Sequence, residues 1–187
     1  MKLFDGKIVW ITGASSGIGE CLVYSFIRKG ATVIASSNES LELEKVKQNC
    51  GEFSDRVRCV PFDLSDTAGI DNIVKEQIEK TGRIDYLLNI GGISQRATIE
   101  ETPLWLDRKI MEINYFGTIA LTKAVLPFMI KQRSGHILAT RAYQDDSVSH
   151  CVPHIPLQNR HCMGSLKHFI LKIKNTTSDR LLLFQDG

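Results

Sequence analysis

The stretch TGASSGIG at residues 12–19 narrows the possible folds of this chain more than any other feature. It follows a short apolar run, KIVWIT at 7–12, and precedes a helical pattern that reaches about Lys29, with Gly30 as its stop. A strand, a glycine-rich turn and a helix in this order open a βαβ unit. The N-terminus of such a helix offers free N–H groups and a positive dipole end, which predicts a site for a pyrophosphate.

The three glycines of this turn have separate expected tasks. Gly13 permits the tight turn, Gly17 lets the backbone approach a phosphate closely, and Gly19 lets the helix pack near the strand. Glycine-rich turns often only connect elements, but a position between a strand and a helix favours cofactor binding. We therefore predict that the turn as a whole binds a dinucleotide, through Gly13, Ser15, Ser16, Gly17, Ile18 and Gly19.

Strand and helix signals alternate through the first 140 residues. Further strands are expected at 31–36, 56–63, 84–90 and 135–140, and helices at 40–49, 66–82 and across most of 103–133. Apolar strands separated by helices imply a parallel sheet covered on both faces, with right-handed crossovers. The predicted class is a doubly wound, Rossmann-like α/β domain over residues 1–140, incomplete at its C-terminal side because the alternation stops after Thr140.

Composition argues against several classes of protein. Hydrophobic residues make up 43% and charged residues 24% of the 187 residues, which is ordinary for a globular domain. Lys and Arg number 23 against 21 Asp and Glu, so the formal charge of +2 gives no reason to expect nucleic acid or a membrane surface as a partner. Charges interrupt the first apolar stretch, and no run reaches the roughly 18 apolar residues of a membrane span. Five cysteines without a CxxC pair indicate reduced thiols and a cytoplasmic protein.

Four motifs, in order along the chain, resemble those of the short-chain dehydrogenase/reductase family. They are the spacing Gly13-x3-Gly17-x-Gly19, Asp63-Leu64 after the third strand, NIGG at 89–92 and INYFGT at 113–118. The longer stretch NIGGISQR also resembles the sub-group around dehydrogenase/reductase member 7. Ile90 and Gly91 depart from the Asn-Asn-Ala-Gly turn of the family, and we expect this to change packing more than chemistry.

The resemblance implies a role for each motif. Asp63 and Leu64 would contact the adenine ring, Asn89 and Gly91 would belong to the cofactor site, and Asn114 would extend a catalytic water relay. Simpler alternatives exist, since Asp63 suits a helix N-cap, Asn89 a turn at a strand end, and Asn114 an ordinary helix position. The family implies hydride transfer between NAD(P)(H) and a small carbonyl or alcohol, and homo-oligomers are possible for an intact relative.

The end of the second strand bears on the choice of nicotinamide cofactor. An acidic residue there would hold the ribose 2′-OH of NAD, and a basic one would favour NADP. Ser36, Ser37 and Asn38 offer hydrogen-bond donors to a 2′-phosphate, while Glu39 is expected to lie too far along and to cap the next helix. We therefore expect NADP(H) rather than NAD(H).

Apart from Asn114, the catalytic residues that the resemblance implies are missing. The family uses a Ser and a Tyr-x-x-x-Lys pair, in which the lysine lowers the pKa of a phenol whose ordinary value is about 10. Tyr143 is the sole tyrosine after Thr140, and Ser147 stands where the lysine belongs. As written, the chain is therefore expected to lack its acid/base and to be inactive.

Residues 141–187 depart from the α/β order and allow three interpretations. One is a zinc site, although the spacing of the candidate ligands is irregular: His150, Cys151, His154, His161, Cys162 and His168. Another is a diverged, non-catalytic protein that binds a nucleotide or a partner. We favour the third, that a one-base slip near codon 140 or 141 produced these residues, by a frameshift in the gene or a sequencing error. No metal site is then expected.

The genetic code supports the slip. Val152 to Asn159 can be written GTT CCG CAT ATT CCG CTT CAA AAC, and reading from the third base gives Ser-Ala-Tyr-Ser-Ala-Ser-Lys, which contains Tyr-x-x-x-Lys. In the same frame, Arg160 to Phe169 can give an apolar helical pattern, and the codons of Arg141 and Ala142 can span a Ser. That Ser lies thirteen positions before the recovered Tyr, which is the spacing of the family.

If the chain is made as written, we expect a poorly ordered tail over 141–187. One short amphipathic helix is possible at SLKHFILKIKN, residues 165–175. The strand at 135–140 would keep an apolar edge without a neighbour, which favours aggregation. Two function classes remain, an oxidoreductase by descent and an inactive nucleotide-binding or interaction protein.

Overall fold

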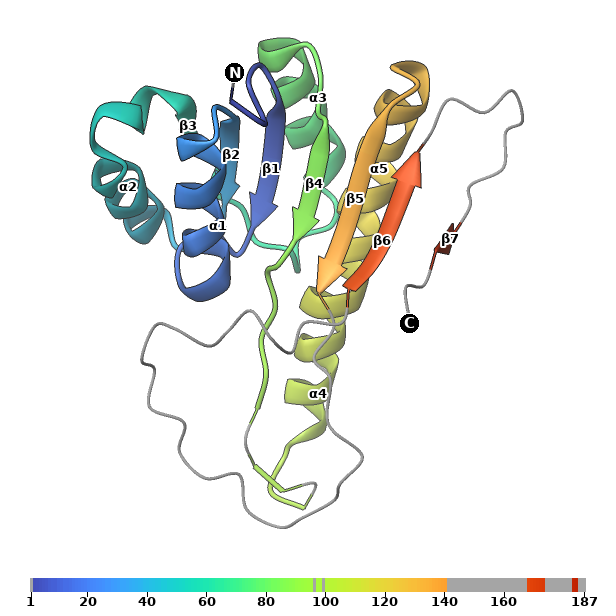
Figure 1. The fold of residues 1–187 in the computed structure, drawn as a ribbon. Coiled ribbons are helices and arrows are strands. Elements are labelled where there is room, and N and C mark those ends of the chain that lie inside the picture. The colour runs from blue at the N-terminus through green and yellow to red at the C-terminus, as the bar shows by residue number, and fades with distance from the viewer. Residues whose placement is uncertain (1, 96, 99, 141–167, 174–182, 185–187) are drawn as a thin grey trace.

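The computed structural model describes residues 2–95, 97–98, 100–140, 168–173 and 183–184. Its sheet has the strand order β3-β2-β1-β4-β5-β6-β7, and the first five of these are parallel (Figure 1). The strands are β1 Ile8–Thr12, β2 Thr32–Ser36, β3 Val57–Cys59, β4 Tyr86–Asn89, β5 Gly135–Thr140, β6 His168–Ile173 and β7 Leu183–Phe184. The order 3-2-1-4-5 is that of a Rossmann-like α/β sheet, as predicted.

Helices cover the sheet on two sides, because successive side chains of each strand point to opposite faces. In β1, Val9 and Ile11 pack on the side of α1 and α2, whereas Trp10 packs on the side of α3 and α5. The helical elements are α1 Gly17–Arg28, α2 Ser40–Asn49, η1 Gly51–Arg56, α3 Ile70–Thr81, α4 Leu104–Met111, η2 Glu112–Gly117 and α5 Thr118–Lys131. Two apolar cores therefore sandwich the sheet.

Two boundaries differ from the sequence prediction by more than two residues. β3 ends at Cys59, short of the predicted 56–63, although the backbone stays beside β2, with Val60 N–H donating to Ala35 O at 2.9 Å and Phe62 N–H to Ser37 O at 3.1 Å. α3 begins at Ile70, and not near Asp66, since residues 63–66 form a turn closed by a hydrogen bond from Asp66 N–H to Asp63 O at 3.1 Å. Both changes lengthen the loop after β3, which borders the cleft described below.

By length and composition alone, the helical stretch Leu104–Lys131 could cross a membrane, which is weak evidence for a span. In this fold Leu121, Val125 and Met129 follow one another at four-residue spacing and are fully buried in the core under the sheet. The stretch is the predicted helix at 103–133, with Pro127 inside α5. The apolar character of its second half, α5, is explained by packing against the sheet.

The structure corrects two expectations about the tail. Residues 168–173, predicted within a helix, form β6, which pairs antiparallel with β5 from Thr140↔His168 to Gly135↔Ile173. The edge of β5 is therefore paired with β6. An unpaired strand edge has free backbone N–H and C=O groups, and these can hydrogen-bond to an apolar segment in extended conformation. The remaining residues between 141 and 187, apart from β7, lie outside the described residues, and so does the prediction of a poorly ordered tail.

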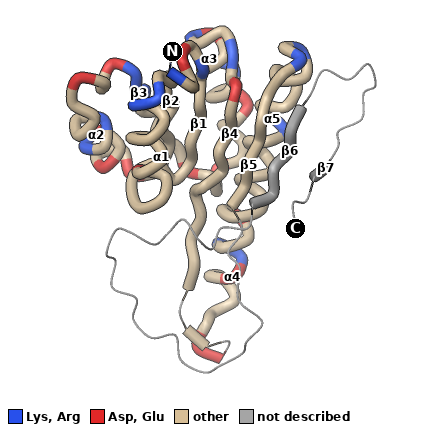
Figure 2. The backbone as a smooth tube through the Cα atoms, viewed as in Figure 1, with Lys and Arg blue, Asp and Glu red and all other residues tan. Residues whose placement is uncertain are grey.

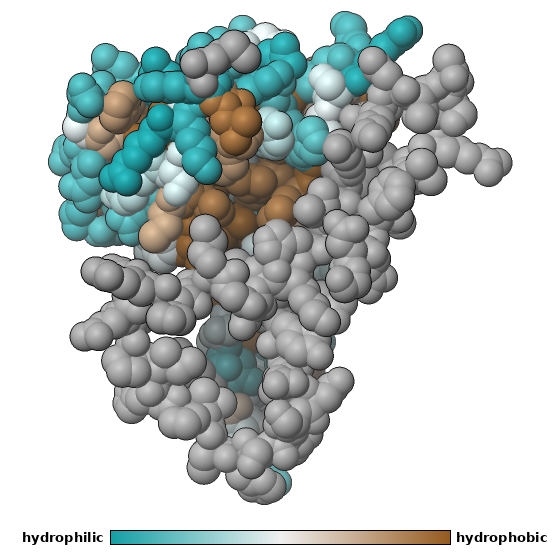
Figure 3. All heavy atoms as spheres, viewed as in Figure 1, coloured by the Kyte–Doolittle hydropathy of each residue, from teal (hydrophilic) through white to brown (hydrophobic). Residues whose placement is uncertain are grey.

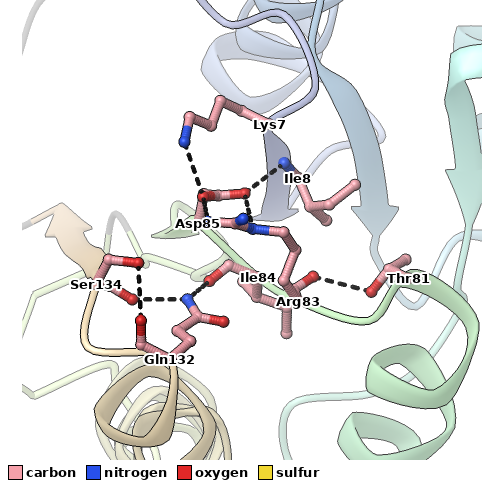
Figure 4. Close-up of polar contacts among 8 residues, drawn as sticks. All are labelled: Lys7, Ile8, Thr81, Arg83, Ile84, Asp85, Gln132 and Ser134. Carbon is pink, nitrogen blue, oxygen red and sulfur yellow. Dashed lines mark hydrogen bonds and ion pairs between the residues drawn. The ribbon is translucent and has the colours of Figure 1, made fainter.

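A buried carboxylate joins β1 and β4 at the amino ends of the strands (Figure 4). Asp85 Oδ2 accepts hydrogen bonds from Ile8 N–H and Arg83 Nε, both at 3.0 Å, and Oδ1 lies 2.5 Å from Arg83 Nη2. Lys7 Nζ approaches Oδ1 at 3.3 Å. Elsewhere, residues of both charge signs occur on α2 and α3 (Figure 2). The Asp85 cluster is far along the strands from the glycine-rich turn and is a structural element.

Candidate dinucleotide-binding site

A cleft of about 480 Å³ opens at the carboxyl ends of the parallel strands, where β1 and β4 lie side by side. This is where ligands bind in open α/β sheets. Every predicted cofactor residue except Asn89 lines it. The lining consists of Thr12, Gly13, Ser15, Ser16, Gly17, Ile18, Gly19, Ser36, Ser37, Asn38, Glu39, Phe62, Asp63, Leu64, Ile90, Gly91, Gly92, Ile93 and Ile113.

Glycine is required at two positions of the turn between β1 and α1. Gly13 has a φ of +64°, and a Cβ placed there would lie 2.6 Å from Gly91 Cα. A Cβ at Gly19 would lie 2.1 Å from Gly13 O. Real Cβ atoms do not approach backbone this closely, so any side chain would push apart the turn, the helix and the strand end. The observed shape is the close-packed cradle that the spacing predicts.

Thr12 fixes this turn against the loop after β4. Its buried Oγ1 accepts hydrogen bonds from Ile90 N–H at 3.1 Å and from Gly91 N–H at 3.0 Å. On the other side, Ala14 N–H donates to Ser36 O at 3.0 Å. The turn is therefore tied to both neighbouring strands. Sequence reasoning missed Thr12, since a threonine at a strand end is explained by β propensity alone.

The N-terminal end of α1 lines the cleft. Ser16 occupies the N-cap position, and its side chain makes no capping hydrogen bond to this turn, which the structure describes in full. The earliest hydrogen bond of the helix runs from Glu20 N–H to Ser16 O at 3.3 Å. The N–H groups before it are at the positive end of the helix dipole and suit the oxygens of a pyrophosphate.

Asp63 lies at the far end of the cleft, after β3. Its Oδ1 accepts hydrogen bonds from Ser65 N–H and Ser65 Oγ, both at 2.8 Å. The backbone hydrogen bond from Ser65, followed by the one from its hydroxyl, holds the pKa of Asp63 below its ordinary value. Asp63 is therefore ionised at neutral pH and does not cap α3, which begins seven residues later at Ile70.

The residues after β2 are arranged differently from the sequence-based expectation. Ser36 Oγ is buried and accepts a hydrogen bond from Trp10 Nε1 at 2.9 Å, so the protein already uses this hydroxyl. Glu39 does occupy the N-cap position of α2, but its side chain makes no capping bond to the described helix. Its Oε2 accepts a hydrogen bond from Ser15 Oγ at 3.1 Å, and it lines the cleft. The expectation that Glu39 lies too far along was wrong.

The two asparagines hold the walls of the site. Asn89 is buried behind the cleft, where its Nδ2 donates to Thr122 Oγ1 of α5 at 3.2 Å. Its Oδ1 has no hydrogen-bond partner among the described residues. Asn114 lies in the π-helical segment η2, accepts from Ile93 N–H at 2.8 Å and donates to Ile93 O at 2.7 Å. Its amide is thus used to hold the loop after β4 against the helix.

The structure does not test the sequence-based interpretations of residues 141–167. Tyr143 and Ser147 lie outside the described residues. So do five residues of the zinc site that was considered and not favoured, His150, Cys151, His154, His161 and Cys162, and only the backbone of His168 is described, in β6. Within the described part of the chain, no cluster of three or more His, Cys, Asp or Glu side chains could hold a metal ion.

The sequence matches the family described as short chain dehydrogenase over residues 7–145. The chain belongs to the short-chain dehydrogenase/reductase family. It is 42% identical over 139 residues to Dehydrogenase/reductase SDR family member 7 of Homo sapiens, covering 72% of this chain and 41% of the human protein. It is 43% identical over 136 residues to Dehydrogenase/reductase SDR family protein 7-like of Drosophila melanogaster, covering 71% and 42%. The chain thus matches less than half the length of these relatives.

Solved structures of short-chain dehydrogenases have the same fold. A short-chain dehydrogenase from Streptomyces avermitilis superposes with a TM-score of 0.65 at 31% identity, over 72% of this chain and 48% of that one. A metagenomic short-chain oxidoreductase in complex with NADP gives a TM-score of 0.68 at 24% identity, over 72% and 61%. At that identity the second likeness concerns the fold alone. The family uses NAD(P) as its cofactor.

Proposed function

We propose that residues 1–140 bind a nicotinamide dinucleotide in this cleft, with its pyrophosphate on the first turn of α1. The observation that carries the proposal is the cradle itself, in which a Cβ at Gly13 or Gly19 would collide with backbone while the first turn of α1 lines the cleft. Polar donors after β2, Ser37 and Asn38, favour NADP(H) over NAD(H). Asp63 and Leu64 border the end assigned to the adenine ring.

The activity proposed for the lineage is that of a short-chain oxidoreductase. Hydride passes from the reduced nicotinamide to a carbonyl carbon while a proton is added to the oxygen, or both return from an alcohol. The proton step needs an acid with a tuned pKa, and the chain has no Tyr-x-x-x-Lys pair anywhere in its sequence. We therefore propose that this chain as written binds the cofactor without turnover.

A one-base slip near codon 140 or 141 accounts for the missing pair. In support, the family match ends at residue 145, close to the codon where the alternative frame begins to supply a Ser, a Tyr and a Lys. Resequencing the coding DNA through codon 141 tests this directly. An unambiguous read in the present frame would leave the second candidate, a diverged nucleotide-binding or interaction protein.

Isothermal titration of the 187-residue chain with NADPH and NADH tests the binding proposal. Binding is expected for the wild type and is expected to be lost in Gly19→Ala, whose Cβ would displace the cradle. Gly69→Ala is the matched control, because a Cβ there meets nothing closer than Asp66 Oδ2 at 3.7 Å. Equal binding by the wild type and Gly19→Ala would place the nucleotide elsewhere, and oxidation of NADPH with any carbonyl substrate would refute the absence of turnover.

A further inference from the structure

A second hollow, separate from the dinucleotide cleft, lies between β3 and α3 and has a volume of about 250 Å³. This exceeds the roughly 30 Å³ of one water molecule and falls just short of the roughly 300 Å³ at which pockets for drug-sized ligands begin. The hollow therefore suits a small ligand. Its lining consists of Arg58, Cys59, Val60, Pro61, Ile73, Glu76, Gln77 and Lys80, none of which lines the dinucleotide cleft.

The helix and the strand each turn one face toward this hollow. The spacing i, i+3, i+4, i+7 places four lining residues on one side of α3, namely Ile73, Glu76, Gln77 and Lys80. Arg58 of β3 and Val60 just beyond it are two residues apart, so their side chains lie on the same face of the sheet. Val60 and Ile73 pack against the apolar core on that face. Arg58 and Gln77 are thus polar residues within otherwise apolar packing.

Two buried polar atoms in the lining have no hydrogen-bond partner among the described residues. They are Oε1 of Gln77, a residue that is only 2% exposed, and Nη1 of Arg58. Such atoms are costly to leave alone, and most in proteins are satisfied by the protein or by a bound molecule. A guanidinium only donates, and an amide oxygen only accepts. A molecule that satisfies both atoms must therefore offer an acceptor to Arg58 and a donor to Gln77.

The charges around the hollow favour a negative ligand over water. Lys80 and Glu76 pair with each other on the exposed side of α3, so their charges offset one another. The guanidinium of Arg58 stays protonated at every physiological pH, and no ion pair joins it to an acidic residue within the described part of the chain. One positive charge remains on the lining. A water molecule would not neutralise it and would fill only a small part of the volume.

We propose that the hollow between β3 and α3 binds a small oxyanion that also carries an O–H group, of which inorganic phosphate at neutral pH is the simplest example. A charged oxygen of the ligand accepts a charge-assisted hydrogen bond from Arg58 Nη1, and its O–H group donates to Gln77 Oε1. The site shares no residue with the dinucleotide cleft, so it does not depend on cofactor binding.

NMR titration of the full 187-residue chain with inorganic phosphate at neutral pH is the test. The side-chain amide signal of Gln77, assigned by its loss in Gln77→Leu, should shift in a saturable way, with a Kd on the order of 1 mM. Sodium chloride at matched ionic strength should not reproduce the shift. Sulfate carries no O–H group at this pH and should bind about tenfold more weakly, because Gln77 Oε1 then stays without a donor.

Variants locate the response. Arg58→Gln should raise the Kd for phosphate at least tenfold. Arg108→Gln removes the same charge from an exposed position on α4 outside the hollow, and it should leave the Kd within about twofold of the wild type. Gly19→Ala disrupts the cradle of the dinucleotide cleft and should leave the Gln77 response unchanged.

The remaining outcomes overturn the proposal. A shift that chloride reproduces would mean that the salt only screens charges. Equal affinity for phosphate and sulfate would remove the role of Gln77 as an acceptor. An unchanged Kd in Arg58→Gln, or an equal loss in Arg108→Gln, would place the anion elsewhere. None of these results bears on the binding of a dinucleotide, which is measured separately with NADPH and NADH.

Discussion

At the scale of single residues, Gly13 combines two separable demands, a left-handed backbone and a close approach to Gly91. Gly51 has nearly the same backbone, with a φ of +57° against +64°, but a Cβ there would meet nothing within 4 Å. Gly51→Ala is therefore expected to cost about 1–2 kcal/mol of unfolding free energy, from the backbone alone. Gly13→Ala should cost a further ~1–3 kcal/mol from overpacking and should abolish cofactor binding. Urea unfolding and NADPH titration of both variants measure this, and equal costs would contradict the close approach.

Ser65 determines how acidic Asp63 is. Ser65→Ala removes the hydroxyl bond but keeps the backbone N–H bond, which is the larger cause, so the pKa of Asp63 should rise yet stay below its ordinary 3.8. Because the folded pKa is depressed, the associated stability is present above that ordinary value and is lost as the pH falls through the folded pKa. NMR titration of the side-chain carboxyl carbon measures the shift. Ser25→Ala, whose hydroxyl bonds Cys21 O, is the control and should leave the Asp63 titration unchanged.

At the scale of secondary-structure elements, Asp85 joins β1 and β4 at the end opposite the cleft. Asp85→Asn is nearly isosteric, but it removes the negative charge that pairs with Lys7 and Arg83. It also leaves one acceptor oxygen where Asp85 has two, one of which accepts from Ile8 N–H. Because both cations are about 40% exposed and can hydrate, we expect a loss of about 1–3 kcal/mol in urea unfolding. Glu76→Gln, which breaks the exposed pair with Lys80 on α3, should cost less than about 0.5 kcal/mol. Equal losses would mean that burial adds nothing to the Asp85 cluster.

The elements that the sequence predicts well are those whose signal is local. The glycine-rich turn, α1 and the apolar strands follow from spacing within a dozen residues, and so does most of the cleft lining. Glu39 was misplaced because the direction of its side chain depends on Ser15, 24 residues away and on another turn. β6 was misplaced for a similar reason, since an apolar segment of six residues fits a helix or a strand until the open edge of β5 decides.

At the scale of the whole molecule, the two faces of the sheet are covered unequally. α3 and α5 bury Leu87 and Ile137 almost completely, whereas Tyr86 and Leu138, which point to the other face of the same strands, remain partly exposed. Figure 3 shows hydrophobic residues gathered in the open at the centre of this face, beside the charged and polar surface of α1 and α2. A further helical layer over β4 and β5 would bury them, and an apolar helical pattern is what the alternative reading frame supplies after residue 160.

A one-base correction of the coding sequence near codon 141 is therefore expected to change two independent properties of the protein, its dye binding and its activity. The corrected protein should bind less of the dye ANS than the 187-residue chain, because its new helix covers the apolar face of β4 and β5. It should also oxidise NADPH with a carbonyl substrate, because the recovered Tyr and Lys supply the missing acid. Replacing the recovered Tyr by Phe should keep the low dye binding and remove turnover, which separates packing from chemistry. Unchanged dye binding together with no turnover in the corrected protein would show that the alternative frame is a coincidence of codons.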